Sequence, residues 1–316
     1  MNGRTAVIIG GGAGIGLEVA RRVVAAGGRV VLGGRTPSRL EAAAATLTGT
    51  SPSPTASMPA ASSGVVSSGV VSSGVVSSGV VSSGVVSSGV VSSGVVSSGV
   101  VSSGVVSSGV VSSGVVSSGV VSSGVVSSGV VSWRVVDTAD QESLSAFFDA
   151  VDQVDHLFTP AATYTTGPMR ELSDEEAQSP FTSKFWGQYH AVRLALPKLT
   201  ADASIVLMAG AASVRPPAPA PAYVACNAAI EGLGRGLAVE LAPVRVNVVS
   251  PGTIDGNLWR QRSDEVRESA FAQYSRDALL ARPGRESEVA DAVMFLFTNT
   301  YMTGSTLYPD GGYALR

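Results

Sequence analysis

The first 26 residues predict a strand and a helix joined by a glycine-rich turn. After Arg4, residues 5–9 are largely apolar and mostly β-branched, as in a buried parallel strand, and the run from Leu17 onward suits a helix. Between them stands Gly-Gly-Gly-Ala-Gly-Ile-Gly, over residues 10–16. Such a turn lets backbone N–H groups approach a pyrophosphate at the positive end of the helix. The order of these elements predicts a dinucleotide-binding turn in preference to a tight turn without a ligand.

The spacing of the glycines differs from the commoner dinucleotide fingerprint. Gly10 is followed by three residues and then by Gly14-Ile15-Gly16. This pattern resembles the Thr-Gly-x-x-x-Gly-Ile-Gly motif of the short-chain dehydrogenase/reductase family, with Ile9 where the family usually has Thr. Later segments resemble the family's other strands in the same order, at residues 30–35, 135–138, 155–158, 204–208, 244–252 and 303–312. The resemblance implies an α/β fold with a single Rossmann-like, doubly wound parallel sheet, in a homodimer or homotetramer.

One tract interrupts this resemblance. The unit Ser-Ser-Gly-Val-Val repeats 14 times without substitution from Ser62 to Val131, and with Ser132 the tract takes 71 of the 316 residues. A period of five places no continuous apolar face on a helix or a strand. We expect one domain formed by residues 1–61 and 133–316, and an insertion over 62–132 that is a flexible loop or, alternatively, a stacked β arrangement. Because it follows a helix predicted over 37–47, the insertion should leave the sheet away from the ligand crevice.

Composition argues against several other classes of protein. The net charge is −3 and the basic residues are dispersed, which does not favour nucleic acid as a partner. No apolar stretch approaches the roughly 18 residues of a membrane span, and the single cysteine, Cys226, excludes an internal disulfide. The chain begins directly in its first strand, so we expect no secretory signal and a cytoplasmic location. His156 and His190 lie far apart, and no metal site is expected.

The end of the second predicted strand indicates which dinucleotide binds. Proteins of this fold that prefer NAD place an acid there, which bonds the ribose 2′-hydroxyl and would repel a 2′-phosphate. This chain has Gly34 followed by Arg35. The missing carboxylate and the guanidinium both favour NADP(H) over NAD(H). The alternative is that Arg35 is an ordinary solvated loop residue.

The resemblance also implies which residues hold the cofactor. The glycine turn takes the pyrophosphate, and the acid that ends the third strand lies near the adenine. The residues carried over in this way are Gly10, Gly12, Gly14, Ile15, Gly16, Arg35, Asp137, Thr138, Ala161, Pro251, Gly252 and Ile254.

The catalytic residues depart from the family pattern. The family's proton donor is the Tyr of Tyr-x-x-x-Lys, and the matching stretch here keeps Tyr223 but has Asn227 in place of Lys. The family's substrate-binding Ser falls at Gly210, and the nearest hydroxyl is Ser213. The family's catalytic Asn falls at Lys184. The resemblance therefore suggests that Lys184 and Asn227 have exchanged places between two helices, the alternative being a lysine on a solvated helix face.

These losses have a chemical cost. A phenol without a neighbouring cation has a pKa of about 10, so it donates a proton readily at neutral pH and is a poor base. A lost hydrogen bond to a developing alkoxide typically costs on the order of a hundredfold in rate. Residues 257–281 fall where the family carries its substrate lid, and Trp259, Phe271 and Tyr274 there could line an apolar pocket or simply pack.

We therefore expect an NADP(H)-dependent oxidoreductase that transfers hydride to or from a small carbonyl, alcohol or similarly polarised substrate. The catalytic residues would be Tyr223, Lys184 and Asn227. The alternative is a dinucleotide-binding protein without turnover, whose cofactor serves structure or sensing.

Overall fold

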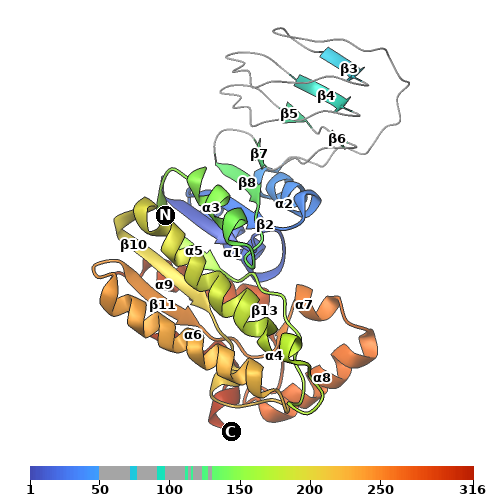
Figure 1. Ribbon diagram of the computed structural model, residues 1–316, viewed down its shortest axis with the longest axis vertical. Coiled ribbons are helices and arrows are strands. Elements are labelled where there is room, and N and C mark those ends of the chain that lie inside the picture. The colour runs from blue at the N-terminus through green and yellow to red at the C-terminus, as the bar shows by residue number, and fades with distance from the viewer. Residues whose placement is uncertain (50–71, 77–90, 97–110, 113–114, 117–122, 127–129) are drawn as a thin grey trace.

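The computed structural model describes residues 1–49, 72–76, 91–96, 111–112, 115–116, 123–126 and 130–316. Their main sheet has eight strands, all parallel to their neighbours except β7 at one edge (Figure 1). In spatial order these are β14(Thr306–Leu307), β11(Arg245–Val249), β10(Leu199–Met208), β9(Val154–Thr159), β1(Thr5–Ile9), β2(Arg29–Gly34), β8(Val131–Val135) and β7(Ser123–Val126). The predicted Rossmann-like, doubly wound fold is confirmed.

The order of the strands places the ligand crevice. β1 pairs with β2 on one side and β9 on the other, and successive strands then extend the sheet outward in both directions. In sheets of this kind, ligands bind outside the carboxyl ends of the strands, where the winding direction reverses. All of the predicted cofactor residues lie beyond the carboxyl ends of β1, β2, β8, β9 or β11.

Helices cover both faces of the sheet. One face packs against α1(Gly14–Ala25), α2(Pro37–Thr48) and α9(Glu286–Thr298), and the other against α3(Gln141–Asp149), α5(Gly187–Ala195) and α6(Pro221–Glu240) (Figure 1). Alternate residues of β1 enter the two layers, with Ile8 buried on the first face and Val7 on the second. Burial on both faces explains why this strand is continuously apolar. None of the described helices is both long and apolar enough to cross a membrane.

Shorter elements complete the domain, and all of them except η2, which leads into the amino end of β10, follow the carboxyl ends of strands or join such segments. These are α4(Asp174–Pro180), the π-helical segment η1(Phe181–Trp186), the short 3₁₀ segments η2(Leu196–Lys198), η3(Ala211–Ser213) and η4(Tyr313–Leu315), the strands β12(Ile254–Asp255) and β13(Gly284–Arg285), and the helices α7(Asn257–Arg260) and α8(Asp264–Asp277). The pairing of β12 with β13 ties α7 to the start of α9.

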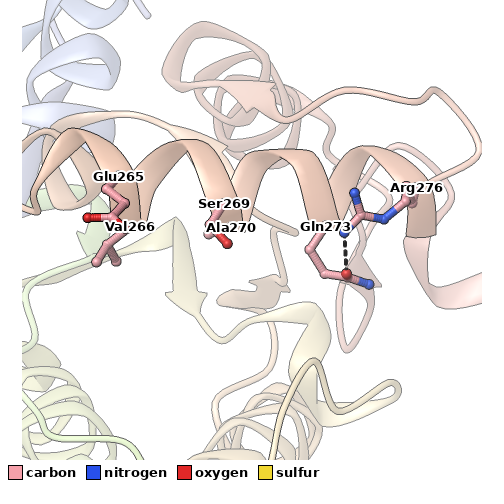
Figure 2. A pocket seen from close by; sticks show the side chains of 6 residues that line it. All are labelled: Glu265, Val266, Ser269, Ala270, Gln273 and Arg276. Atoms are coloured by element: carbon pink, nitrogen blue, oxygen red, sulfur yellow. Dashed lines mark hydrogen bonds between the residues drawn. The ribbon is translucent and has the colours of Figure 1, made fainter.

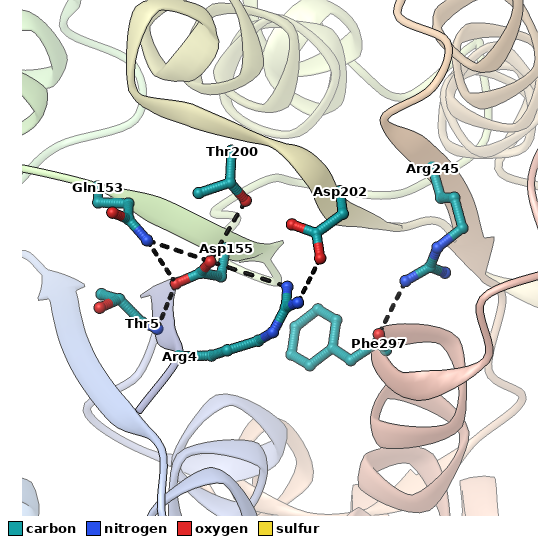
Figure 3. Close-up of polar contacts among 8 residues, drawn as sticks. All are labelled: Arg4, Thr5, Gln153, Asp155, Thr200, Asp202, Arg245 and Phe297. Atoms are coloured by element: carbon teal, nitrogen blue, oxygen red, sulfur yellow. Dashed lines mark hydrogen bonds and ion pairs between the residues drawn. The ribbon is translucent and has the colours of Figure 1, made fainter. Parts of the chain in front are cut away.

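Polar contacts fix the opposite edge of the sheet, at the amino ends of the strands (Figure 3). The Asp155 carboxylate accepts from the Thr5 backbone N–H at 2.8 Å and from the Thr200 hydroxyl at 3.3 Å. Arg4 forms ion pairs with Asp155 and Asp202. These contacts join β1, β9 and β10 and hold their relative positions, away from the crevice.

The last residues of the repeat belong to the main sheet. β8 begins at Val131, which pairs with Val30 and is fully buried, so the expected domain boundary at residue 133 falls inside a strand. Other described stretches form a small parallel sheet of β3(Ser72–Val76), β4(Val91–Val96), β5(Val111–Ser112) and β6(Val115–Val116). Ser72 pairs with Ser92, so equivalent positions of the repeat are in register. These short described strands pair in parallel, and the choice between a flexible loop and a stacked β arrangement for the insertion stays a prediction.

Candidate active site

The glycine turn brings the start of α1 close to the end of β1 with no side chains between them. Gly10 has a φ of 108°, in the left-handed region that favours glycine, and a Cβ there would lie 2.9 Å from the backbone nitrogen of Ala161. A Cβ on Gly16 would overlap the carbonyl oxygen of Gly10. Only glycine allows α1 to begin this close to the end of β1. An open backbone at the positive end of a helix fits the pyrophosphate of a dinucleotide.

The other predicted cofactor residues surround this turn. Ala161 donates its backbone N–H to the Ile9 carbonyl at 3.0 Å, which ties the loop after β9 to the end of β1. Asp137 accepts from the backbone N–H of Ala139 at 3.0 Å, and the Thr138 hydroxyl donates to the Ser183 carbonyl at 3.4 Å. Pro251, Gly252 and Ile254 follow β11. The structure thus brings the predicted cofactor residues to one edge of the sheet.

Arg35 directly follows the carboxyl end of β2. The side chain is exposed, and its guanidinium donates to the Thr163 hydroxyl at 2.7 Å. At Gly34 a Cβ would face the Leu40 side chain at 3.3 Å. Neither Gly34 nor Arg35 supplies a carboxylate that could hydrogen-bond a ribose 2′-hydroxyl. The exposed Arg35 guanidinium is accessible to an anion.

Lys184 and Asn227 meet in a buried polar contact. Lys184 is 4% exposed, and its Nζ donates to Asn227 Oδ1 at 2.6 Å and to the Ala209 carbonyl at 2.9 Å. Asn227 Nδ2 donates in turn to the Tyr223 carbonyl at 2.8 Å. Nζ also lies 5.3 Å from the centroid of the Tyr223 ring. Lys184 is therefore not a solvated surface lysine, and the three residues predicted to be catalytic lie together.

A π-helical segment positions the lysine. Residues Phe181–Trp186 form η1 between α4 and α5, directly after Pro180. Such segments insert an extra residue into a helical turn and often occur at functional sites. Within this one Ser183 and Lys184 are both buried although they are adjacent in sequence. No sequence periodicity predicts this geometry.

A second phenol, which the sequence analysis missed, lies against Tyr223. Tyr164 follows β9 and stacks on the Tyr223 ring, with centroids 5.1 Å apart and hydroxyl oxygens 3.5 Å apart. Burial, and then the neighbouring Tyr223, raise the pKa of Tyr164 well above its ordinary value. Gly210 also faces Tyr223, since a Cβ there would lie 3.3 Å from the Tyr223 hydroxyl.

The Ser213 hydroxyl proton is engaged by a buried carboxylate. Its hydroxyl donates to Glu231 Oε1 at 2.6 Å, and Ser250 donates to the same oxygen at 2.8 Å. The Tyr308 hydroxyl bonds the other carboxylate oxygen at 3.0 Å. Glu231, on α6, is 7% exposed. This cluster joins the segments that follow β10, β11 and β14, and it gives Ser213 a structural partner.

Residues 257–281, where the resemblance predicts a lid, contain α7 and α8. One side of α8 lines a shallow open hollow, and its side chains point into open space (Figure 2). They are Glu265, Val266, Ser269, Ala270, Gln273 and Arg276. Trp259 and Phe271 pack edge to face, with ring centroids 5.8 Å apart. Tyr274 is buried, stacks on Tyr313 and donates to the Asp310 carbonyl, so it packs and does not line a pocket.

Fold and site together define a dinucleotide-binding α/β protein. Residues 4–60 match a family model described as short chain dehydrogenase, and residues 121–314 match one described as Enoyl-(Acyl carrier protein) reductase. The chain belongs to the short-chain dehydrogenase/reductase family, whose members are NAD(P)-dependent oxidoreductases.

Individual relatives agree with this assignment. An uncharacterized oxidoreductase of Schizosaccharomyces pombe is 30% identical over 185 residues, which cover 56% of this chain and 71% of the relative. The short-chain dehydrogenase/reductase malC of Malbranchea aurantiaca is 29% identical over 163 residues, 51% of this chain and 61% of malC, less than two thirds of its length.

Solved structures show the same fold. The MalC reductase/Diels-Alderase of Malbranchea aurantiaca superposes with a TM-score of 0.70 at 20% identity, covering 100% of this chain and 98% of that one. A small-chain dehydrogenase solved in complex with NADPH has a TM-score of 0.63 at 20% identity, and the match covers 100% of both chains.

Proposed function

We propose that this protein is an NADP(H)-dependent reductase that transfers hydride to a small carbonyl or similarly polarised substrate. The observation that carries the proposal is the buried ammonium of Lys184, which bonds Asn227 and lies beside the Tyr223 ring. Burying an ammonium costs several kcal/mol unless other groups compensate it. A lysine held in this place suits a site in which the neighbouring group becomes negative.

The bound dinucleotide would supply the hydride. Tyr223 would donate its proton to the substrate oxygen as negative charge develops there, and its own oxygen would then carry the charge. The Lys184 ammonium favours that phenolate from inside the protein. Asn227 would orient Lys184 through the 2.6 Å bond and hold the Tyr223 backbone through the 2.8 Å bond. Lys184 and Asn227 would thus share the family's usual roles from exchanged positions.

The proposed preference for NADP(H) rests on the end of β2. The Arg35 guanidinium is exposed and can exchange its bond with the Thr163 hydroxyl for a charge-assisted bond with a 2′-phosphate. Gly34 offers no carboxylate to compete. The pyrophosphate would lie on the backbone of Gly10, Gly12, Gly14, Ile15 and Gly16, with the residues after β8, β9 and β11 around the rest of the cofactor.

A binding protein without turnover is the second candidate. The observation that favours it is Gly210, which brings no hydroxyl to the place where Tyr223 would meet a substrate. Such a protein would bind NADPH and leave it unreacted.

One assay separates the two candidates. Purified protein is mixed with NADPH and, in turn, menadione, diacetyl and benzaldehyde, and NADPH oxidation is compared with the rate without protein. The reductase predicts oxidation with at least one probe, lost in Tyr223→Phe and kept in Tyr301→Phe, whose ring is 99% exposed. Tight NADPH binding without oxidation would favour the second candidate.

A further inference from the structure

We propose that Tyr164 is a second catalytic phenol, which donates a hydrogen bond to the same substrate oxygen as Tyr223. It would fill the role that the missing hydroxyl at Gly210 leaves open. The inference rests on the proposed function, and it adds a residue that neither the sequence pattern nor the family resemblance identifies.

The two phenols converge on one point. Their rings are stacked at an interplanar angle of 29°, and the Tyr164 hydroxyl donates toward the Tyr223 oxygen over 3.5 Å. Lys184 Nζ lies 5.7 Å from the Tyr164 centroid and 5.3 Å from the Tyr223 centroid. A bond of 3.5 Å is long for two hydroxyls, whose usual separation is about 2.7 to 2.8 Å. An oxygen placed between them could accept from both.

The loop that carries Tyr164 is fixed on both sides of it. The Thr163 backbone donates to the Ser183 hydroxyl at 3.3 Å, and that hydroxyl donates back to the Thr163 carbonyl. The Thr165 backbone donates to the Ser179 hydroxyl at 2.9 Å. Both serines belong to the continuous helical run of α4 and η1, which also carries Lys184. The same element therefore positions the ammonium and the second phenol.

Gly210 explains why a second donor is needed. Its φ of −178° is ordinary extended backbone, so no conformational requirement selects glycine here. A Cβ would lie 3.3 Å from the Tyr223 hydroxyl and 3.2 Å from Asn227 Oδ1, which requires shifts of only a few tenths of an ångström. A hydroxyl at this position could reach the substrate oxygen, and glycine provides none.

The protonation state of Tyr164 suits a donor. Burial raises its pKa well above the ordinary phenol value, so it keeps its proton at neutral pH. In the reaction, hydride adds to the carbonyl carbon, the C=O π electrons move to oxygen, and the Tyr223 proton completes the new O–H bond. NADPH is oxidised and the carbonyl is reduced. Tyr164 retains its proton throughout and only donates a hydrogen bond.

The first test is a rescue of activity. Tyr164→Phe keeps the stacked ring and is expected to lower kcat by about tenfold to a hundredfold with the probe that wild type reduces. Adding Gly210→Ser to Tyr164→Phe should recover most of that loss, because it restores a hydroxyl beside Tyr223. Adding Gly210→Ala, which brings the Cβ without the hydroxyl, should recover none. An unchanged kcat in Tyr164→Phe, or equal recovery by Ser and Ala, would overturn the proposal.

The second test needs no turnover. Acetate supplies a carboxylate oxygen that can accept from both phenols, and its binding is measured by calorimetry. We expect Tyr164→Phe to weaken acetate binding by about tenfold and Gly210→Ser to restore it. Acetate binding that Tyr164→Phe does not weaken, or the absence of acetate binding to wild type, would overturn the inference. Tyr164-dependent acetate binding without NADPH oxidation by any probe would reject the proposed function and with it the catalytic role of Tyr164, and would uphold only the convergence of the two hydroxyls on one acceptor.

Discussion

Helix α6 carries two buried polar groups one turn apart, and their surroundings differ in charge. Asn227 accepts a bond from the Lys184 ammonium, which also bonds the Ala209 carbonyl. Glu231, four residues further along, accepts hydrogen bonds from hydroxyl groups on three separate segments. The first site buries a cation among neutral oxygens, and the second buries an acidic group among donors.

The difference indicates what each site does. Three hydroxyl donors satisfy a buried carboxylate, so the Glu231 cluster is a closed structural unit that joins loops. At Lys184 no carboxylate of the described residues lies within ion-pairing distance, and neutral oxygens supply only part of the compensation that a buried ammonium needs. A phenolate at Tyr223 would supply the remaining compensation for the Lys184 ammonium. We infer that Glu231 holds the fold and that Lys184 serves the reaction.

The largest effect on turnover is expected when the Lys184 ammonium is removed. Lys184→Met should lower turnover by about a hundredfold or more, because the phenolate of Tyr223 loses its nearest positive charge, while NADPH affinity changes by less than about threefold. Steady-state kinetics and fluorescence titration with NADPH measure the two quantities. Lys198→Met, outside the site, is the matched control. Equal losses of turnover and affinity would make Lys184 a binding residue only.

A third buried group offers a pH test of the fold. His156 is 2% exposed, and neither of its ring nitrogens has a hydrogen-bond partner among the described residues. Burial lowers its pKa to about 4, from an ordinary value of 6.5, with Arg4 adding to the effect. Between these values the unfolded chain binds the proton and the folded one does not, so stability falls as pH falls. The loss should be about 2 kcal/mol by about pH 5.

Denaturant unfolding at several pH values measures this loss. His156→Leu should remove most of the fall between about pH 7 and 5, and His190→Gln, at the other histidine, should keep it. A wild-type stability that stays flat over this range would show that His156 is protonated in the fold.

The next effect is at Glu231 and concerns stability. Glu231→Gln leaves the hydroxyl groups of Ser213, Ser250 and Tyr308 with a weaker acceptor, and the free energy of unfolding should fall by about 1 to 3 kcal/mol. Turnover should change by less than about threefold. Glu240→Gln, on the exposed end of the same helix, is the control. A large loss of turnover with unchanged stability would reverse the contrast between the two sites.

Much of this architecture could be predicted from the sequence because its causes are local. The close approach of Gly16 to Gly10 requires glycine whatever surrounds it. The buried strands have a signal of their own, because helices cover both faces of the sheet and favour an apolar residue at every strand position. The contact between Lys184 and Asn227 could be predicted only as an exchange relative to a family pattern. Their roles remain predictions.

Other parts of the site have no local signal. Tyr164 reaches Tyr223 because Ser179 and Ser183 hold a loop that is distant in sequence from α6. The π-helical turn that buries Lys184 breaks the helical period on which sequence reasoning relies. The start of β8 inside the repeat depends on the pairing of Val131 with Val30, which the repeat pattern does not reveal.

The exposed charge of Arg35 should affect the choice of cofactor. Arg35→Ala should weaken NADPH binding by about 1.5 kcal/mol and leave NADH binding unchanged, because only NADPH carries the 2′-phosphate. Calorimetry with both cofactors measures the difference. Equal affinities of wild type for NADPH and NADH would overturn the assignment.

The smallest effect is expected at the repeat. Replacing residues 62–121 by a few polar residues keeps β7 and β8 and should change the free energy of unfolding by about 1 kcal/mol or less, since loop-closure entropy depends only on the logarithm of length. NADPH binding should be unchanged. A shortened chain that fails to fold, or that loses NADPH, would show that the tract is structural.

The most direct test of the account is to reverse the exchange. In Lys184→Asn with Asn227→Lys, the ammonium and the amide trade helices across a contact of 2.6 Å. Each single variant should lose about a hundredfold in NADPH-dependent turnover. Lys184→Asn alone leaves two neutral amides and no cation beside Tyr223, and Asn227→Lys alone places two ammonium groups against each other. The double variant is predicted to recover at least about a third of wild-type turnover. A double variant as inactive as Lys184→Asn alone would contradict the account.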